Sequence, residues 1–192
     1  MLYITNFADQ SVILPVMVLI ALGLVWAGWP RAAVAWAVVV PATLGAVLLG
    51  KLLVAGCGSP FPYEWNLRSP SGHAASAGIV FGGMTALLFP ARYRVCLGLA
   101  FGLAAATVIG LSRLALRVHT ISDVITGGAI GIAGAMLLAR LAGPRPQRLK
   151  HIPAIASSFV LVVILFHGAH LHAEAWISRR GTANWPFTLC SR

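Results

Sequence analysis

The sequence predicts an all-α fold, a bundle of six transmembrane helices, and three observations lead to this prediction. Charged residues make up only 9% of the 192 residues, whereas they make up roughly a quarter of a soluble domain. The mean hydropathy is +0.88. Apolar stretches long enough to cross a hydrocarbon core of about 30 Å recur along the whole chain. We therefore expect a single integral membrane domain over residues 1–192, without a separate soluble domain.

Prolines and basic residues separate the apolar stretches, as they do where helices end. The first stretch follows Met1–Gln10, which contains Asp9 and no Lys or Arg. A secretory signal normally begins with a positive region, so we interpret this stretch as a retained span. In chain order, the predicted spans cover about residues 12–29, 32–50, 72–90, 93–111, 122–141 and 152–170.

Basic residues at the span ends predict the orientation. With the N-terminus outside, the inside and outside segments hold equal numbers of Lys and Arg. Setting aside Lys51, Arg68, Arg113 and Arg117 as residues of a polar site leaves an excess inside, which favours an outside N-terminus. The small size and compact loops point to a bacterial inner membrane, with the site facing the periplasm.

The net charge of +10 predicts the partners of the chain. The basic residues are spread over the span ends and do not cluster as a nucleic-acid groove requires. Anionic lipid headgroups of the bilayer are therefore the expected partners, and nucleic acid is not.

Two of the predicted loops are unusually polar. Because successive spans alternate in direction, the loop after the second span and the loop after the fourth open on the same side of the membrane. Their side chains can therefore meet in one site. The polar residues are Lys51, Glu64, Arg68, Ser71 and then His73 in the first loop, and Ser112, Arg113, Arg117, His119 and Asp123 in the second.

Ser71 follows Pro70 and precedes an apolar stretch, which is typical of a helix N-cap. The amides of Gly72 and His73 would then point outward at the positive end of the helix dipole, an arrangement that binds anions. Gly72 leaves room for a phosphate to approach the backbone. Arg68 and Arg113, together with Lys51, could supply the countercharge. Taken alone, however, Ser71 could be only a cap, and Lys51 could simply extend its amine to the membrane interface.

His119 and Asp123 are four residues apart, one helical turn. A carboxylate so placed can accept the Nδ1 proton of the imidazole, leaving Nε2 as a nucleophile or base. His73 on the other loop would be available as a general acid, a division of labour that suits phosphoryl transfer. Glu64 is the only other carboxylate near these loops, too few for a magnesium site. No metal or other cofactor is expected, and no matching ligands accompany His167, His170 and His172.

The two polar loops contain the motifs P-S-G-H at residues 70–73 and S-R-x5-H-x3-D at residues 112–123. In this order, and within a signature region of about 48–135, they resemble the signatures of the type 2 phosphatidic acid phosphatase superfamily of membrane lipid phosphatases. The resemblance implies a nucleophilic His119 that forms a phosphohistidine, oriented by Asp123, with His73 as general acid. It also implies that Ser71, Gly72 and Arg113 bind phosphate.

The family's first motif, K-x6-R-P, is only partly present. Lys51 is followed seven residues later by Gly58, where the motif has arginine, and the proline comes at Pro60. We hypothesise that Arg68 substitutes for the missing arginine from a different position in the sequence.

The predicted function is hydrolysis of the terminal phosphate of a lipid phosphate or diphosphate without a metal ion. Prenyl diphosphates, phosphatidate, phosphatidylglycerol phosphate and phosphorylated lipid A are all candidate substrates, because the loops do not discriminate among them. A lipid phosphotransferase would use the same residues, and a non-catalytic lipid-binding membrane protein is the alternative outside enzymes. A vanadate-dependent haloperoxidase shares the signature, but those enzymes are soluble and much larger, so this is the most distant alternative function.

The remaining expectations concern glycines and cysteines. Gly78-x3-Gly82 and Gly127-x3-Gly131 predict close contact between the third and fifth spans. Cys57 and Cys190 would share the outer side, so a disulfide between them is predicted. Cys96 is expected to stay reduced, and Arg117 is expected to be an interfacial anchor.

Overall fold

The computed structural model describes residues 2–57, 62, 65–146 and 152–166. Over these ranges the chain is helical and contains no strand. Two short helices, α1 (Leu2–Thr5) and η1 (Asn6–Ala8), come first. The longer helices are α2 (Gln10–Trp26), α3 (Pro30–Cys57), α4 (Gly72–Leu88), α5 (Ala91–Ala115), α6 (Ile121–Leu141) and α7 (Ile152–Phe166).

The longer helices lie where the sequence predicts the six spans, and the all-α prediction is confirmed. Three of the described helices, α3, α5 and α6, are long and apolar enough to cross a membrane. The helices α2 and α4 are apolar but shorter, at 17 residues each. The fold therefore supports a membrane protein, while the crossing by all six helices stays a prediction.

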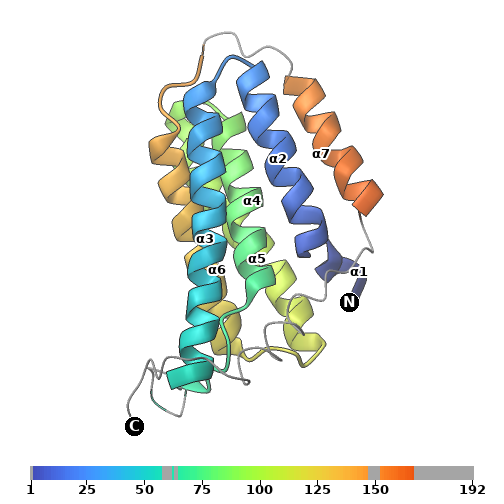
Figure 1. The fold of residues 1–192 in the computed structure, drawn as a ribbon, viewed down its shortest axis with the longest axis vertical. Coiled ribbons are helices and arrows are strands. Elements are labelled where there is room, and N and C mark those ends of the chain that lie inside the picture. The colour runs from blue at the N-terminus through green and yellow to red at the C-terminus, as the bar shows by residue number, and fades with distance from the viewer. Residues whose placement is uncertain (1, 58–61, 63–64, 147–151, 167–192) are drawn as a thin grey trace.

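The helices run alternately up and down, so their connections fall at two ends of the bundle (Figure 1). The connections between α3 and α4 and between α5 and α6 lie at one end, where α1 also lies. These are the two polar loops of the sequence. The alternation therefore brings them to the same end, as predicted.

Small residues place α4 at the centre of the bundle. Its first turns are almost entirely buried, from Ala74 to Val80. A β-carbon added to Gly78 would lie 3.2 Å from the backbone of Gly131, and one added to Gly82 would lie 2.8 Å from the carbonyl oxygen of Gly98. The contact between α4 and α6 is the predicted one. Gly82 also lies in the contact between α4 and α5, which the sequence did not predict.

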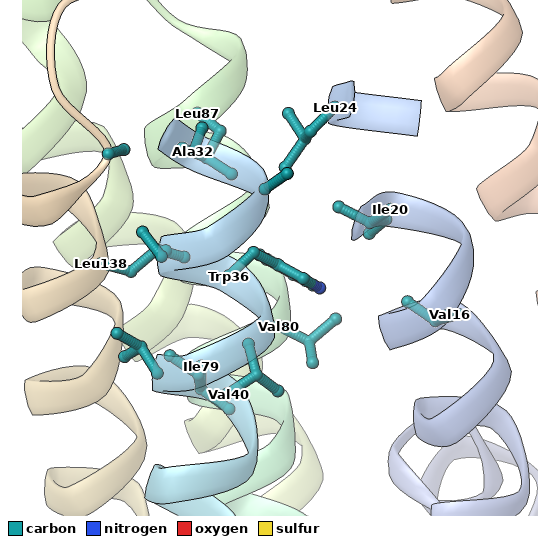
Figure 2. Close-up of a cluster of buried hydrophobic side chains, with 14 of the residues drawn as sticks. Val16, Ile20, Leu24, Ala32, Trp36, Val40, Ile79, Val80, Leu87 and Leu138 are labelled. Carbon is teal, nitrogen blue, oxygen red and sulfur yellow. The ribbon is translucent and has the colours of Figure 1, made fainter. Parts of the chain in front are cut away.

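A cluster of apolar side chains joins α2, α3, α4 and α6 (Figure 2). Trp36 of α3 is fully buried in it, and its indole Nε1 donates to the carbonyl oxygen of Met17 at 3.0 Å. Leu138 of α6 and Ile79 of α4 are also fully buried. This packing fixes the helices that carry the polar loops.

The outer faces of the helices are apolar as well. Leu22, Val34 and Ile164 are each at least 60% exposed in the isolated chain. Such side chains suit contact with lipid tails. Lipid tails form no hydrogen bonds with the backbone, so a segment in contact with them must pair its own N–H and C=O groups, as a helix does.

Arginines tie the other end of the bundle together. Arg31 Nε donates to the Leu141 carbonyl at 3.0 Å, and Arg94 donates to the Gly143 carbonyl at 2.8 Å. Trp29 Nε1 donates to Ala142 O at 3.0 Å. These bonds satisfy carbonyls at the C-terminal end of α6, where positive charge is also favoured by the helix dipole.

The predicted disulfide lies outside the described residues, because Cys190 and the side chain of Cys57 are not described. Cys96 on α5 is a free, exposed thiol. His167, His170 and His172 also lie outside the described residues.

Candidate active site

Asp123 in the first turn of α6 connects the two loops. Its Oδ1 accepts from the backbone N–H groups of Arg68 at 2.9 Å and Ser69 at 2.8 Å. Its Oδ2 accepts from Thr120 N at 3.0 Å, and the Thr120 hydroxyl accepts from Asp123 N in return, which makes a capping box. The side chain of Asp123 is 1% exposed. This carboxylate therefore both begins α6 and holds the end of the preceding loop.

His119 lies against the same carboxylate. Its Nδ1 is 3.3 Å from Asp123 Oδ2, and its side chain is only 5% exposed. The contact is the one that the four-residue spacing predicts. An aspartate on Nδ1 fixes the tautomer in which Nε2 carries the lone pair, so the geometry suits a nucleophilic or basic imidazole.

Further hydrogen bonds join the loops around this pair. Thr120 Oγ1 donates to the carbonyl of Asn66 at 3.0 Å, and the Ser122 hydroxyl donates to the carbonyl of Trp65. Ser71 N donates to Asp123 O at 2.9 Å. The two loops, about 50 residues apart in the sequence, thus form one surface.

Ser71 is the N-cap of α4, as predicted. Its hydroxyl accepts from Ala74 N at 3.4 Å, and the residue is fully buried. A β-carbon on Gly72 would meet only the Lys51 side chain, at the ordinary distance of 3.8 Å. Protein packing therefore does not require glycine at position 72, and Lys51 lies beside the first turn of α4.

Arg113 and Arg68 differ in their surroundings. Arg113, in the last turn of α5, is buried, and one guanidinium nitrogen lies 3.5 Å from the Thr5 hydroxyl. Arg68 has an exposed side chain that donates to Asn66 Oδ1 at 3.3 Å, while its backbone bonds to Asp123. Arg68 is thus attached to the site through its main chain.

The N-terminal segment, residues 5–10, also reaches the site, and no pattern in the sequence predicts this. Asp9 Oδ2 lies 3.8 Å from His73 Nε2, and Gln10 Nε2 donates to Ser76 Oγ at 3.2 Å. The expectation that Glu64 is the only carboxylate near the loops besides Asp123 is therefore wrong. The chain folds back so that Asp9, at the start of α2, meets the start of α4.

Two residues with side chains occupy the left-handed backbone region beside the site. Arg117 has φ of +57° and Asn66 has φ of +45°. This conformation is uncommon outside glycine. Arg117 makes the turn between the end of α5 and His119, so the strain lies where the loop must present the histidine.

A family model described as the PAP2 superfamily matches residues 51–147, about half of the chain. The chain belongs to the PAP2 superfamily. The resemblance seen in the sequence is therefore confirmed, and membership supports a phosphatase-type activity. The matched range contains both histidines and Asp123 but not the N-terminal segment.

One curated relative of this PAP2 chain comes from Klebsiella pneumoniae, where it is described as an uncharacterized 22.5 kDa protein in the cps region. The two sequences are 30% identical over an alignment that covers 95% of this chain and 90% of the relative. No solved structure matches the chain significantly.

Proposed function

We propose that this PAP2 chain is a membrane phosphatase that removes the terminal phosphate from a lipid phosphate or diphosphate through a phosphohistidine on His119. The contact of 3.3 Å between His119 Nδ1 and Asp123 Oδ2 carries the proposal. It orients the imidazole in the loop that follows α5, whose last turn carries the buried Arg113, in a family whose membership supports phosphatase chemistry.

The first step transfers the phosphoryl group to the enzyme. The Nε2 lone pair of His119 attacks phosphorus, and the bond from phosphorus to the lipid oxygen breaks. That oxygen takes a proton from the imidazolium of His73 and leaves as the alcohol, or as the lipid monophosphate where the substrate is a diphosphate.

The second step restores the enzyme. Water gives a proton to the now neutral His73 and attacks the phosphorus of the phosphohistidine, and the bond to His119 Nε2 breaks. One water is consumed, inorganic phosphate is released, and both histidines return to their starting states.

Phosphate binding in this scheme uses charge and amides. Arg113 is the principal countercharge, and the first amides of α4, at Gly72 and His73, face the anion at the positive end of the helix dipole. Lys51 and Arg68 supply further positive charge. Ser71 orients this turn through its cap. Because Ser71 is fully buried and its N–H donates to Asp123 O, it supports the phosphate-binding amides of Gly72 and His73 through this orientation.

The surroundings of His119 favour a lipid substrate. Val118 and Ile121 flank the histidine and are 53% and 66% exposed, and Ile125, one turn further along α6, is 62% exposed. Apolar side chains at the entrance suit a substrate whose phosphate is attached to a hydrocarbon chain. We place this entrance at the periplasmic surface of a bacterial inner membrane, with the six longer helices crossing it.

The test is phosphate release by purified protein in detergent from a panel of lipid phosphates and diphosphates, in the presence of EDTA. We expect release by the wild type, its loss in His119→Ala, and wild-type rates in Arg92→Ala, an exposed arginine at the other end of the bundle. Radiolabelled phosphate trapped on the protein should be stable in alkali and labile in acid.

Three outcomes would contradict the proposal. Phosphate release by His119→Ala would exclude a phosphohistidine intermediate on His119. Loss of phosphate release in EDTA would show that a metal ion is needed. Phosphate that appears only on an added lipid or sugar acceptor would make the protein a phosphotransferase.

A further inference from the structure

The side chains of Asp9 and His73, which are 64 residues apart in the sequence, lie within ion-pair distance of each other. Asp9 Oδ2 lies 3.8 Å from His73 Nε2. The side chains are 11% and 13% exposed, so both are largely removed from water. Charges attract more strongly in such surroundings than at an exposed surface. Asp9 lies outside residues 51–147, the part of the chain that the family model matches.

The two oxygens of Asp9 have different contacts. Oδ1 accepts from Ser11 N at 2.9 Å and from the Ser11 hydroxyl at 2.8 Å, which makes Asp9 the N-cap of α2. Oδ2 faces His73. The cap therefore fixes the rotation of the carboxylate and directs its second oxygen toward the imidazole.

Two further contacts hold this segment against the site. Gln10 Nε2 donates to Ser76 Oγ of α4 at 3.2 Å, one turn beyond His73. Thr5 Oγ1 lies 3.5 Å from a guanidinium nitrogen of Arg113 on α5. The backbone around Asp9 is thus tied to both helices that carry the candidate phosphate ligands.

We propose that Asp9 is a positioning residue for His73 in the reaction, an inference that rests on the proposed function. The carboxylate holds the Nε2 edge of the imidazole, which leaves Nδ1 as the nitrogen that exchanges a proton with the substrate. It also stabilises the imidazolium that must exist before the lipid oxygen departs.

Asp9→Asn tests this role because asparagine caps a helix as well as aspartate does. The variant keeps the cap and removes the charge. The measured quantity is kcat/KM on two substrates. It reports the steps from substrate binding to departure of the leaving group. The leaving group of dodecyl phosphate is an alkoxide, which needs a proton to depart. The leaving group of 4-nitrophenyl phosphate is 4-nitrophenolate, a stable anion that needs little protonation.

We expect Asp9→Asn to lower kcat/KM for dodecyl phosphate about 10-fold, a part of the roughly 10²–10⁴ that general acid–base catalysis contributes. Activity on 4-nitrophenyl phosphate and the inhibition constant of inorganic phosphate should stay near wild type. His73→Ala should show the same substrate dependence more strongly, and the double variant should match it, because coupled residues are not additive.

Ser11→Ala is the matched control, since it removes one contact of Oδ1 and leaves the charge in place. It should follow the wild type on both substrates. Equal losses on the two substrates, wild-type kcat/KM in Asp9→Asn, or additive effects with His73→Ala would overturn the proposal. Activity that survives His119→Ala would instead overturn the proposed function, so the two failures are distinguishable.

Discussion

The main chain of Ser71 packs directly on Gly127 of α6. A β-carbon at position 127 would overlap the Ser71 carbonyl oxygen and approach its nitrogen to 2.8 Å. One turn earlier on α6, Asp123 O accepts from Ser71 N at 2.9 Å. The first turns of α4 and α6 therefore form one rigid unit, and this unit sets the separation between His73 and the pair of His119 and Asp123.

Gly127→Ala should destabilise the protein because the added methyl group must push α4 away from α6. Overpacking of this kind costs typically about 1–3 kcal/mol. Gly128→Ala is the control, because its β-carbon would meet Ala106 at an ordinary 3.5 Å. Thermal melting in detergent, followed by tryptophan fluorescence, compares the two. Equal melting temperatures would show that the contact between the helices is looser than described.

Asp123→Asn should reduce both stability and activity. The amide group would meet donors on both sides, and a buried donor left without an acceptor costs about 1–3 kcal/mol. Loss of the oriented histidine should lower kcat by roughly 10²–10⁴. Ser122→Ala removes only the bond to Trp65 O. It should lower the free energy of unfolding by less than about 1.5 kcal/mol and leave the activity unchanged. A wild-type melting curve for Asp123→Asn would contradict the structural role.

Arg68→Ala tests whether the Arg68 side chain substitutes for the missing arginine of the first motif. Its bond to Asp123 comes from the backbone and survives the substitution, so any loss reports the side chain. We expect kcat/KM to fall about 10-fold, close to the value of one charge-assisted hydrogen bond, and Arg113→Ala to cost more. Wild-type kcat/KM in Arg68→Ala would remove this residue from the phosphate site.

Arg117 should tolerate glycine and resist a β-branched residue. Its φ of +57° costs an L-residue roughly 1–2 kcal/mol, a cost that glycine does not have. We expect Arg117→Val to melt below Arg117→Gly, with phosphate release near wild type in the glycine variant. Loss of activity in Arg117→Gly without loss of stability would show that the arginine side chain contributes to the site.

The sequence predicted those parts of the site that depend on local spacing and on the order of the spans. The contact between His119 and Asp123 follows from one helical turn, and Ser71 as N-cap follows from its place before an apolar stretch. The meeting of the two loops follows from the alternation of the helices. Each of these relationships needs only short-range geometry or a count of spans.

The contact of Asp9 with His73 could not be predicted in this way. It depends on how η1 and the start of α2 pack against α4, and no periodic pattern in residues 1–10 indicates a partner. The bonds from Asp123 to the backbone of Arg68 and Ser69 were missed for a related reason. Any residue except proline can supply a backbone N–H group, so the side-chain sequence does not indicate which residues do so.

The double use of Asp123 affects how relatives of this chain should be interpreted. Because the carboxylate holds the preceding loop as well as the imidazole, selection for folding alone would keep an aspartate at this position. Under the proposed function, a relative that retained the aspartate after losing His119 would still fold and would have no nucleophile. If His119 is the nucleophile that we propose, the histidine, and not the aspartate, is the residue whose presence separates working enzymes from inactive descendants.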